Sequence, residues 1–211
     1  AEAAVFRVSY ATTYYALVQR GRIKAGETVL VLGAGGAVGY AAIQVAKALG
    51  AKVIGSASTV VKRELATQGG ADAVVDSRSG TWRDDVKAAN NGKPVDIVID
   101  PIGGEATEPA FRSLAWNGRH LVIGFAGGFI PKLPINLALL KGASLIGVDV
   151  RKFGEYEPEA AAANVDALFN LYRAGSLRPP IAKTYALDDY VPAMVEARSG
   201  ETAGRIVLTM R

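Results

Sequence analysis

The stretch TVLVLGAGGAVGYAAIQVAKALGA, residues 28–51, decides the fold of this 211-residue chain. Its first five residues, 28–32, are apolar and mostly β-branched, which is typical of a strand buried on both faces of a sheet. Glycine and alanine alone fill the next five positions, and apolar residues then recur at helical spacing from about Ala37 to Leu49. A turn that only reverses the chain needs one or two glycines. This turn is therefore predicted to let a ligand approach the backbone closely.

Strand, glycine turn and helix in this order form the unit that binds dinucleotides. In that unit the free N–H groups at the start of the helix point at the pyrophosphate, and small residues let the backbone approach it. Gly36 and Gly39 stand at the second and third glycine positions of G-x-G-x-x-G, whereas Ala34, preceded by Gly33, stands at the first. The pattern alone is weak evidence, but between a buried strand and a helix it predicts dinucleotide binding. A purely structural turn is the alternative.

Strands and helices alternate along the rest of the chain. Five more strands are expected, at residues 52–57, 71–76, 95–100, 118–125 and 144–150. The expected helices cover residues 60–68, about 81–90 and about 106–115, and a proline-rich crossing spans 130–142. Strands separated by helices are joined by right-handed crossovers. The sequence thus predicts an α/β fold with a doubly wound, parallel, six-stranded (Rossmann) sheet.

The second strand indicates which nicotinamide dinucleotide is preferred. An acidic residue about 20 positions beyond the glycines would bind the ribose 2′-hydroxyl of NAD. The matching positions, 56–59, read Ser-Ala-Ser-Thr and are followed by Lys62 and Arg63. Hydroxyls and a cation would bind the 2′-phosphate of NADPH, which a carboxylate would repel. NADPH is the expected cofactor, although Lys62 and Arg63 would also suit a solvated first helical turn.

The two ends of the chain differ from its middle. Residues 1–27 are expected to form a helical lead-in with one helix at about 11–20, and residues 28–155 an NADP-binding Rossmann domain. Residues 156–211 contain two further helices, about 159–174 and 188–198, and two strands that find no obvious place in the first sheet. We therefore expect this tail to be the remnant of a second, incomplete substrate domain.

Composition excludes several classes of protein. The chain has no cysteine and a single histidine, so a disulfide framework is excluded and a self-contained zinc site nearly so. Its net charge of +4 comes without a basic block with interleaved aromatics, which argues against nucleic acid as a partner. The mild positive charge suits an anionic cofactor or simply a solvated surface. No apolar run reaches the roughly 18 residues of a membrane span and no signal peptide opens the chain. We expect a soluble, cytoplasmic protein without a membrane partner.

A family resemblance is carried by four stretches: ATTYYALVQRGRIKAGETVLVLGAGGAVGYAAIQVAKALGAKVI (11–54), DIVIDPIGGEATEPAFRSLAWNGRHLVIGFAGG (96–128), NLALLKGASLIGV (136–148) and LDDYVPAMVEARSGETAGRIVLTM (187–210). Together they resemble the zinc-independent quinone oxidoreductase branch of the medium-chain dehydrogenase/reductases. Members of this branch typically show A-x-x-G-x-x-G at the turn, so Gly33 is a mild departure. A whole substrate domain precedes the matching part in that family, so the chain looks like a cofactor domain with its tail.

The resemblance implies positions for the parts of NADPH and argues against a metal. It places the pyrophosphate on Gly36, Ala37 and Val38 in the turn that Gly33 and Gly39 shape, the adenosine phosphate at Ser56, Ser58 and Lys62, the adenine ribose beside Ile102, and the nicotinamide over Gly124, Phe125 and Ala126 with Thr12 approaching it. Zinc-containing relatives have a ligand cysteine about where Val8 stands. Valine cannot bind a metal, which supports the zinc-free branch.

The activity that the resemblance implies is transfer of a hydride from NADPH to a quinone or another activated alkene. The nicotinamide would do the chemistry, and no acid–base group is required or found. Catalytic residues therefore remain unassigned. Two alternatives stay open: an enoyl reductase that acts on acyl thioesters, and a dinucleotide-binding module without turnover of its own.

Several further residues could have either a structural or a functional role. His120 lies among apolar strand residues and is expected to be a core histidine, while Asp100 and Asp149 end strands, where ligand-facing residues collect. Tyr14 and Tyr15 would suit packing or a substrate platform. The strand 144–150 is expected at the sheet edge, where an apolar strand is prone to pairing. The resemblance implies that two such edges pair, so a homodimer is predicted.

Overall fold

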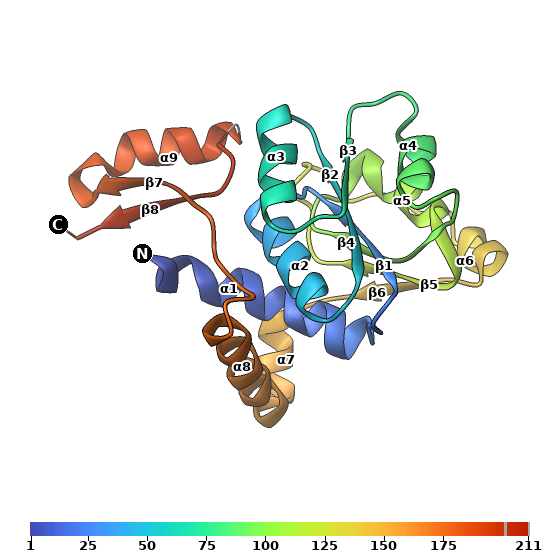
Figure 1. The fold of residues 1–211 in the computed structure, drawn as a ribbon, viewed down its shortest axis with the longest axis horizontal. Coiled ribbons are helices and arrows are strands. Elements are labelled where there is room, and N and C mark those ends of the chain that lie inside the picture. The colour runs from blue at the N-terminus through green and yellow to red at the C-terminus, as the bar shows by residue number, and fades with distance from the viewer. Residues whose placement is uncertain (201, 211) are drawn as a thin grey trace.

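The computed structural model describes residues 1–200 and 202–210, which contain a six-stranded sheet and a separate two-stranded sheet (Figure 1). The larger sheet has the order β3-β2-β1-β4-β5-β6, and all of its neighbouring strands run parallel. Its strands are β1 (Thr28–Leu32), β2 (Lys52–Ala57), β3 (Ala73–Asp76), β4 (Val95–Asp100), β5 (Leu114–Val122) and β6 (Ser144–Gly147). The predicted doubly wound α/β fold is confirmed.

Strand β1 lies at the centre of this sheet and is buried along its whole length. Because side chains alternate along a strand, Val29 and Val31 point to one face while Leu30 and Leu32 point to the other. Every residue of the strand is apolar except the first, Thr28, since both faces are covered by helices. The run TVLVL therefore could not have formed an amphipathic surface strand.

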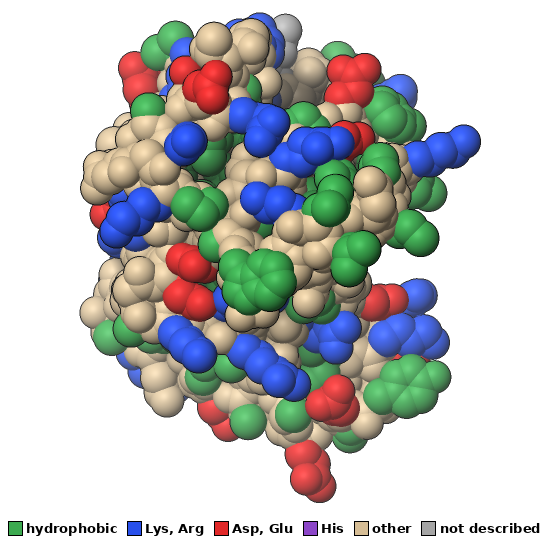
Figure 2. Space-filling model, turned by 90° about the vertical axis from the view of Figure 1, so that its right-hand side faces the viewer, with side chains coloured by type: hydrophobic (Ala, Val, Ile, Leu, Met, Phe, Trp, Pro, Cys, Tyr) green, Lys and Arg blue, Asp and Glu red, His purple; other side chains and the backbone are tan. Residues whose placement is uncertain are grey.

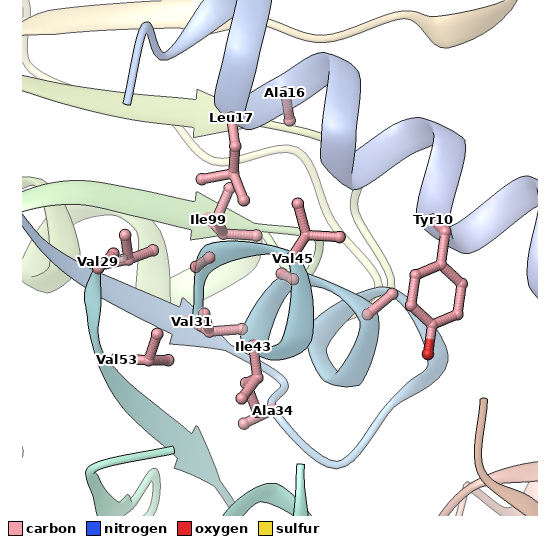
Figure 3. Packing of buried hydrophobic residues seen from close by; sticks show 14 of the residues in the cluster. Tyr10, Ala16, Leu17, Val29, Val31, Ala34, Ile43, Val45, Val53 and Ile99 are labelled. Carbon is pink, nitrogen blue, oxygen red and sulfur yellow. The ribbon is translucent and has the colours of Figure 1, made fainter. Parts of the chain in front are cut away.

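Helices cover the sheet in two layers. The first layer lies on the face of Val29 and Val31 and comprises α1 (Glu2–Tyr15), α2 (Ala37–Ala48) and α3 (Val60–Gln68), while α8 (Pro158–Arg173) packs against α1. Figure 3 shows Tyr10 and Leu17, from the N-terminal helical segment, and Ile43 and Val45 from α2 around this part of the core. The opposite layer comprises α4 (Trp82–Ala89), α5 (Thr107–Arg112) and α6 (Asn136–Lys141). No helix in the described part of the chain could cross a membrane.

Some predicted boundaries were wrong. The first helix begins at Glu2 and not near residue 11, because Val5, Phe6 and Tyr10 continue the same buried face, and the segment Ala16–Arg20 is a π-helix. Strand β5 begins at Leu114, four residues early, since it pairs with Val95 before an irregularity in the register. Strand β6 ends at Gly147 and not at residue 150. Asp149 then caps α7 (Val150–Tyr156) by accepting hydrogen bonds from two backbone N–H groups.

The C-terminal segment forms a small unit of its own. Strands β7 (Ile181–Ala186) and β8 (Arg205–Thr209) pair in parallel, and α9 (Tyr190–Ser199) connects them after a short 3₁₀ turn, Leu187–Asp189. Figure 1 shows this unit beside the N-terminal end of α1, away from the six-stranded sheet. The predicted division of the chain at residues 27 and 155 stays a prediction. Two residues of the predicted tail, 201 and 211, lie outside the described residues.

Candidate functional site

A cavity of about 1030 Å³ opens at the carboxyl ends of β1, β2 and β4. The chain leaves β1 toward β2 on one side, whereas β4 lies on the other side of β1. Parallel sheets bind their ligands at such a switch in strand order, outside the carboxyl ends of the strands. The volume is in the range of sites for large organic cofactors.

The glycine turn forms the floor of this cavity. Gly33 adopts a φ of 61°, and a Cβ atom on it would lie 2.6 Å from Cδ1 of Ile102. Gly36 donates its N–H to the carbonyl of Gly33 at 2.9 Å and is the N-cap of α2. A Cβ on Gly39 would overlap the carbonyl oxygen of Gly33, so only glycine lets α2 pack this close to the turn. Among the described residues no side chain caps this end of α2, and its first N–H groups have no side-chain acceptor.

The second strand leads to the polar end of the cavity. Ser56 is buried, and its hydroxyl accepts a hydrogen bond from Nε1 of Trp82 at 2.8 Å. Thr59 caps α3, and Lys62 lines the cavity while its ammonium group donates to the carbonyl of Gly200. Ser58 also lines this end. This end of the cavity thus presents hydroxyls and the ammonium group of Lys62.

Arg63, the other cation expected here, is committed elsewhere. Its guanidinium donates to the carbonyl of Ala57 at 3.1 Å and forms an ion pair with Asp76 at 3.0 Å. NAD-specific sites carry an acidic residue at the end of β2. In this chain β2 ends without one, and the nearby carboxylate is Asp76, which ends β3 beside Ala57. Arg63 neutralises that carboxylate. A hydrogen bond from the backbone N–H of Arg78, together with the charges of Arg63 and Arg78, lowers the pKa of Asp76 below its usual value.

The loop after β4 forms the wall opposite α3. Asp100, at the end of β4, accepts hydrogen bonds from the backbone N–H groups of Ile102 and Gly103 and from the hydroxyl of Thr107. Its Oδ2 atom also lies 2.9 Å from Nε2 of His120. Burial raises the pKa of Asp100, but the hydrogen bonds from these partners and the charge of His120 outweigh it and lower that pKa. Asp100 therefore fixes the backbone of the loop that carries Ile102.

Six of the predicted site residues line the cavity: Gly33, Gly36, Ser56, Ser58, Lys62 and Ile102. The others are absent from its lining. Ala37, Val38 and Gly39 are the first residues of α2, while Gly124, Phe125 and Ala126 belong to the loop after β5. Ala126 donates its N–H to the carbonyl of Pro101, which joins that loop to the cavity wall. Thr12 is buried in α1, where its hydroxyl donates to the carbonyl of Val8. The roles assigned to these residues stay predictions.

Residues after β3 line the cavity without having been predicted to do so. They are Ser77, Ser79, Gly80, Thr81, Trp82, Arg83 and Asp84. A signal was present in the sequence, because this run of hydroxyl residues and glycine stands between a strand and a helix, at the same edge as the glycine turn. Of the remaining candidates, His120 is fully buried in the core, as expected, but its hydrogen bonding is only partly satisfied, because Nδ1 has no partner among the described residues. Tyr15 stacks on Phe153 at 4.1 Å. In the described residues no three His, Asp or Glu side chains form a metal-binding group.

Comparisons with known proteins agree with this architecture. A family model described as zinc-binding dehydrogenase matches residues 37–165. The quinone oxidoreductase-like protein 2 of Bos taurus is 35% identical over all 211 residues, which span 60% of that protein. A probable oxidoreductase from Mycobacterium abscessus superimposes with a TM-score of 0.86 at 38% identity, over 99% of this chain and 62% of that one. A mycobacterial protein solved in complex with NADPH gives 0.88 at 27% identity, over 97% of this chain and 63% of that one. The chain thus spans about 60% of the length of the quinone oxidoreductase-like relatives that it matches.

Proposed function

The chain belongs to the zinc-binding dehydrogenase family, and from this premise we propose that it is the cofactor-binding part of an NADPH-dependent oxidoreductase. The resemblance to the quinone oxidoreductase branch is confirmed by the family model and by the bovine relative. The proposed reaction is the two-electron reduction of a quinone, or of another activated alkene, with one proton taken from solvent. The oxidoreductase class follows from the family, whereas the acceptor is our inference.

The observation that carries this proposal is the glycine-floored cavity. A bulky or capped helix start would exclude a diphosphate, but here Gly36 begins α2 without a side-chain cap. The positive φ of Gly33 and the contact between Gly33 and Gly39 keep the backbone of the turn close to the helix. Free N–H groups at a helix start, together with the positive end of the helix dipole, favour a phosphate group. The residues present therefore fit a dinucleotide.

Each end of the cavity supports one part of the cofactor. The turn at Gly36 would hold the diphosphate, and the apolar side chain of Ile102 would pack against a ribose. Ser58 and Lys62 would bind the adenosine phosphate, because a hydrogen bond to a charged group contributes about 1.5–3 kcal/mol. Bound NADPH would supply the hydride; this chain's own groups would position it and keep water away.

Selectivity for NADPH over NADH is supported by the charges around the second strand. No carboxylate ends β2, and the carboxylate at the end of β3, Asp76, is paired with Arg63. Lys62 is thus a cation beside the cavity, and within residues 1–200 and 202–210 its ammonium group donates to a backbone carbonyl and to no carboxylate. A dianionic 2′-phosphate would gain from this ammonium group, whereas a 2′-hydroxyl would gain little.

A titration followed by a turnover assay tests the function. Quenching of tryptophan fluorescence or enhancement of cofactor fluorescence should saturate with NADPH, and NADH should bind about tenfold more weakly. If neither dinucleotide binds, the proposal fails. Oxidation of NADPH is then followed with phenanthrenequinone and with an enoyl thioester. Turnover of the quinone alone supports the proposed acceptor, turnover of the thioester supports an enoyl reductase, and binding without turnover identifies a cofactor-binding module.

We also propose that the protein is a homodimer through the edge of the six-stranded sheet. Strand β6 is the last strand on that side, and Leu145 is half exposed on it. An exposed apolar edge strand exposes unpaired backbone groups that a second copy can satisfy. The expected result of sedimentation at micromolar concentration is a mass of two chains.

A further inference from the structure

Cations that are scattered along the sequence come together on the side of the molecule formed by α4, α5 and α6. They surround a recess of about 310 Å³ that is distinct from the cofactor cavity, and they are Arg83, Lys87, Lys93, Arg112 and Lys141. Figure 2 looks onto this side, where Lys and Arg side chains lie close to one another. We call this hollow the basic recess.

Few carboxylates balance these charges. Arg112 pairs with Glu108 at 2.6 Å. In residues 1–200 and 202–210, the other four cations have no carboxylate within salt-bridge distance. Asp84 is the one acidic residue in the lining of the basic recess, and it forms none of these ion pairs. Two carboxylates, Glu108 and Asp84, therefore stand against five cations around a small, partly enclosed volume.

The surroundings of Lys141 disfavour the positive charge of its own ammonium group. Burial, together with the charge of nearby Arg83, lowers the pKa of the Lys141 ammonium group. Like charges held together in a partly desolvated place favour loss of a proton or capture of an anion. An anion between Arg83 and Lys141 would relieve this repulsion.

We propose that the basic recess is a binding site for a phosphate group, free or as a phosphate monoester. A phosphate dianion carries enough charge for several cations, and its oxygens match the paired N–H groups of an arginine. Arg83 would supply those groups, while Lys141 and Lys93 would act as point charges; Nε and Nη2 of Arg112 already donate to Glu108. The site is separate from the proposed cofactor site, although Arg83 lines both hollows.

Titration with inorganic phosphate tests the proposal on the 211-residue chain. Amide resonances are followed at constant ionic strength, with chloride replaced by phosphate. We expect saturable shifts confined to residues near 83–87, 93–94, 112–113 and 141. Lys141→Gln and Lys93→Gln should each weaken phosphate binding about tenfold, because each removes one charge-assisted contact. The exposed cation Arg22, which lies outside the recess, provides the matched control Arg22→Gln, and this variant should bind as the unmodified chain does.

Two further measurements test whether phosphate binds specifically in the basic recess. Shifts that stay linear in phosphate, or that sulfate and chloride reproduce equally, would overturn the proposal, since they indicate general screening only. The titration is then repeated with a saturating amount of NADPH. An unchanged affinity for phosphate supports a separate site, whereas loss of phosphate binding would assign the recess to the cofactor's own phosphates and overturn the proposal. A phosphate monoester such as glucose 6-phosphate shows whether an ester is accepted, and failure of both ligands refutes the site.

Discussion

Oδ2 of Asp100 lies 2.9 Å from Nε2 of His120, and both side chains are buried between β4 and β5. The other carboxylate oxygen of Asp100, Oδ1, accepts hydrogen bonds from the backbone N–H groups of Ile102 and Gly103. One buried carboxylate thus links the sheet to the wall of the cofactor cavity. The pair connects the stability of the core with the shape of the site.

Replacing Asp100 with asparagine should therefore affect both stability and binding. The Asp100→Asn side chain keeps the shape but loses the charge that these donors share, which should cost about 2 kcal/mol of unfolding free energy. Affinity for NADPH should fall several-fold, because the loop with Ile102 loses its anchor. Urea unfolding and a cofactor titration measure the two effects. Asp149→Asn is the control, since asparagine caps a helix as well as aspartate does, and this variant should change neither quantity.

The stability of the protein should depend on pH through the same carboxylate. The folded protein lowers the pKa of Asp100, so the group stabilises the fold above its unfolded pKa of about 3.9. That contribution is lost as the pH falls below about 4 and through the lowered pKa. The difference in unfolding free energy between the unmodified chain and Asp100→Asn should accordingly shrink from pH 6 toward pH 2.5. A difference that stayed constant over this range would mean that the charge of Asp100 does not stabilise the fold.

Gly39 is predicted to be irreplaceable for steric reasons. In Gly39→Ala the new methyl group would overlap the carbonyl oxygen of Gly33, which is backbone and cannot move aside without opening the turn. We expect loss of measurable NADPH binding and a marked fall in melting temperature. Gly154→Ala is the matched control, because that glycine lies in α7 and a methyl group on it would meet no atom within 4 Å beyond its chain neighbours and its own helix backbone. It should stabilise the helix by up to about 1 kcal/mol. Normal binding by Gly39→Ala would contradict the account of the turn.

The region around the glycine turn shows how much of the site could be foreseen. The run TVLVL and the glycines that follow it predicted β1, the turn and α2 correctly, because local sequence determines all three. The local sequence predicted that Lys62 and Arg63 both lie near the cofactor phosphate, whereas of these two residues only Lys62 lines the cavity. Arg63, in α3, pairs with Asp76 at the end of β3, the strand that follows this helix. Which of the two adjacent cations is neutralised depends on a contact between α3 and the end of β3, and that contact is not visible in the local pattern.

Likewise, Asp100 and His120 each had a plausible separate role in the sequence. Their pairing follows from the register of β4 and β5, in which His120 lies beside Val98. The irregularity between Val95 and Ile97 sets that register, and no pattern in the sequence predicted this irregularity. The same is true of the basic recess, where Lys93 and Lys141 are far apart in the chain and meet only through the packing of α4, α5 and α6.

The homodimer can be tested at its edge strand. Leu145→Lys should yield a single-chain mass in sedimentation, because a charge on the exposed side of β6 opposes pairing of two edges. Val60→Lys places the same charge on exposed α3, away from that edge, and should leave the mass unchanged. A single-chain mass for the unmodified protein would contradict the dimer directly.

The last prediction concerns the choice between the two nicotinamide dinucleotides. Lys62→Gln removes the ammonium group beside the cavity and should weaken NADPH binding about tenfold, which corresponds to one charge-assisted hydrogen bond. NADH has no 2′-phosphate, so its affinity should change less than about twofold. Lys24→Gln, on the exposed segment before β1, removes an equal charge from a distant place and should alter neither affinity. Competitive titration of both dinucleotides measures the ratio. An equal loss for NADPH and NADH would show that Lys62 acts on the shared diphosphate, or through Gly200, and would leave the selectivity to the hydroxyls of the second strand.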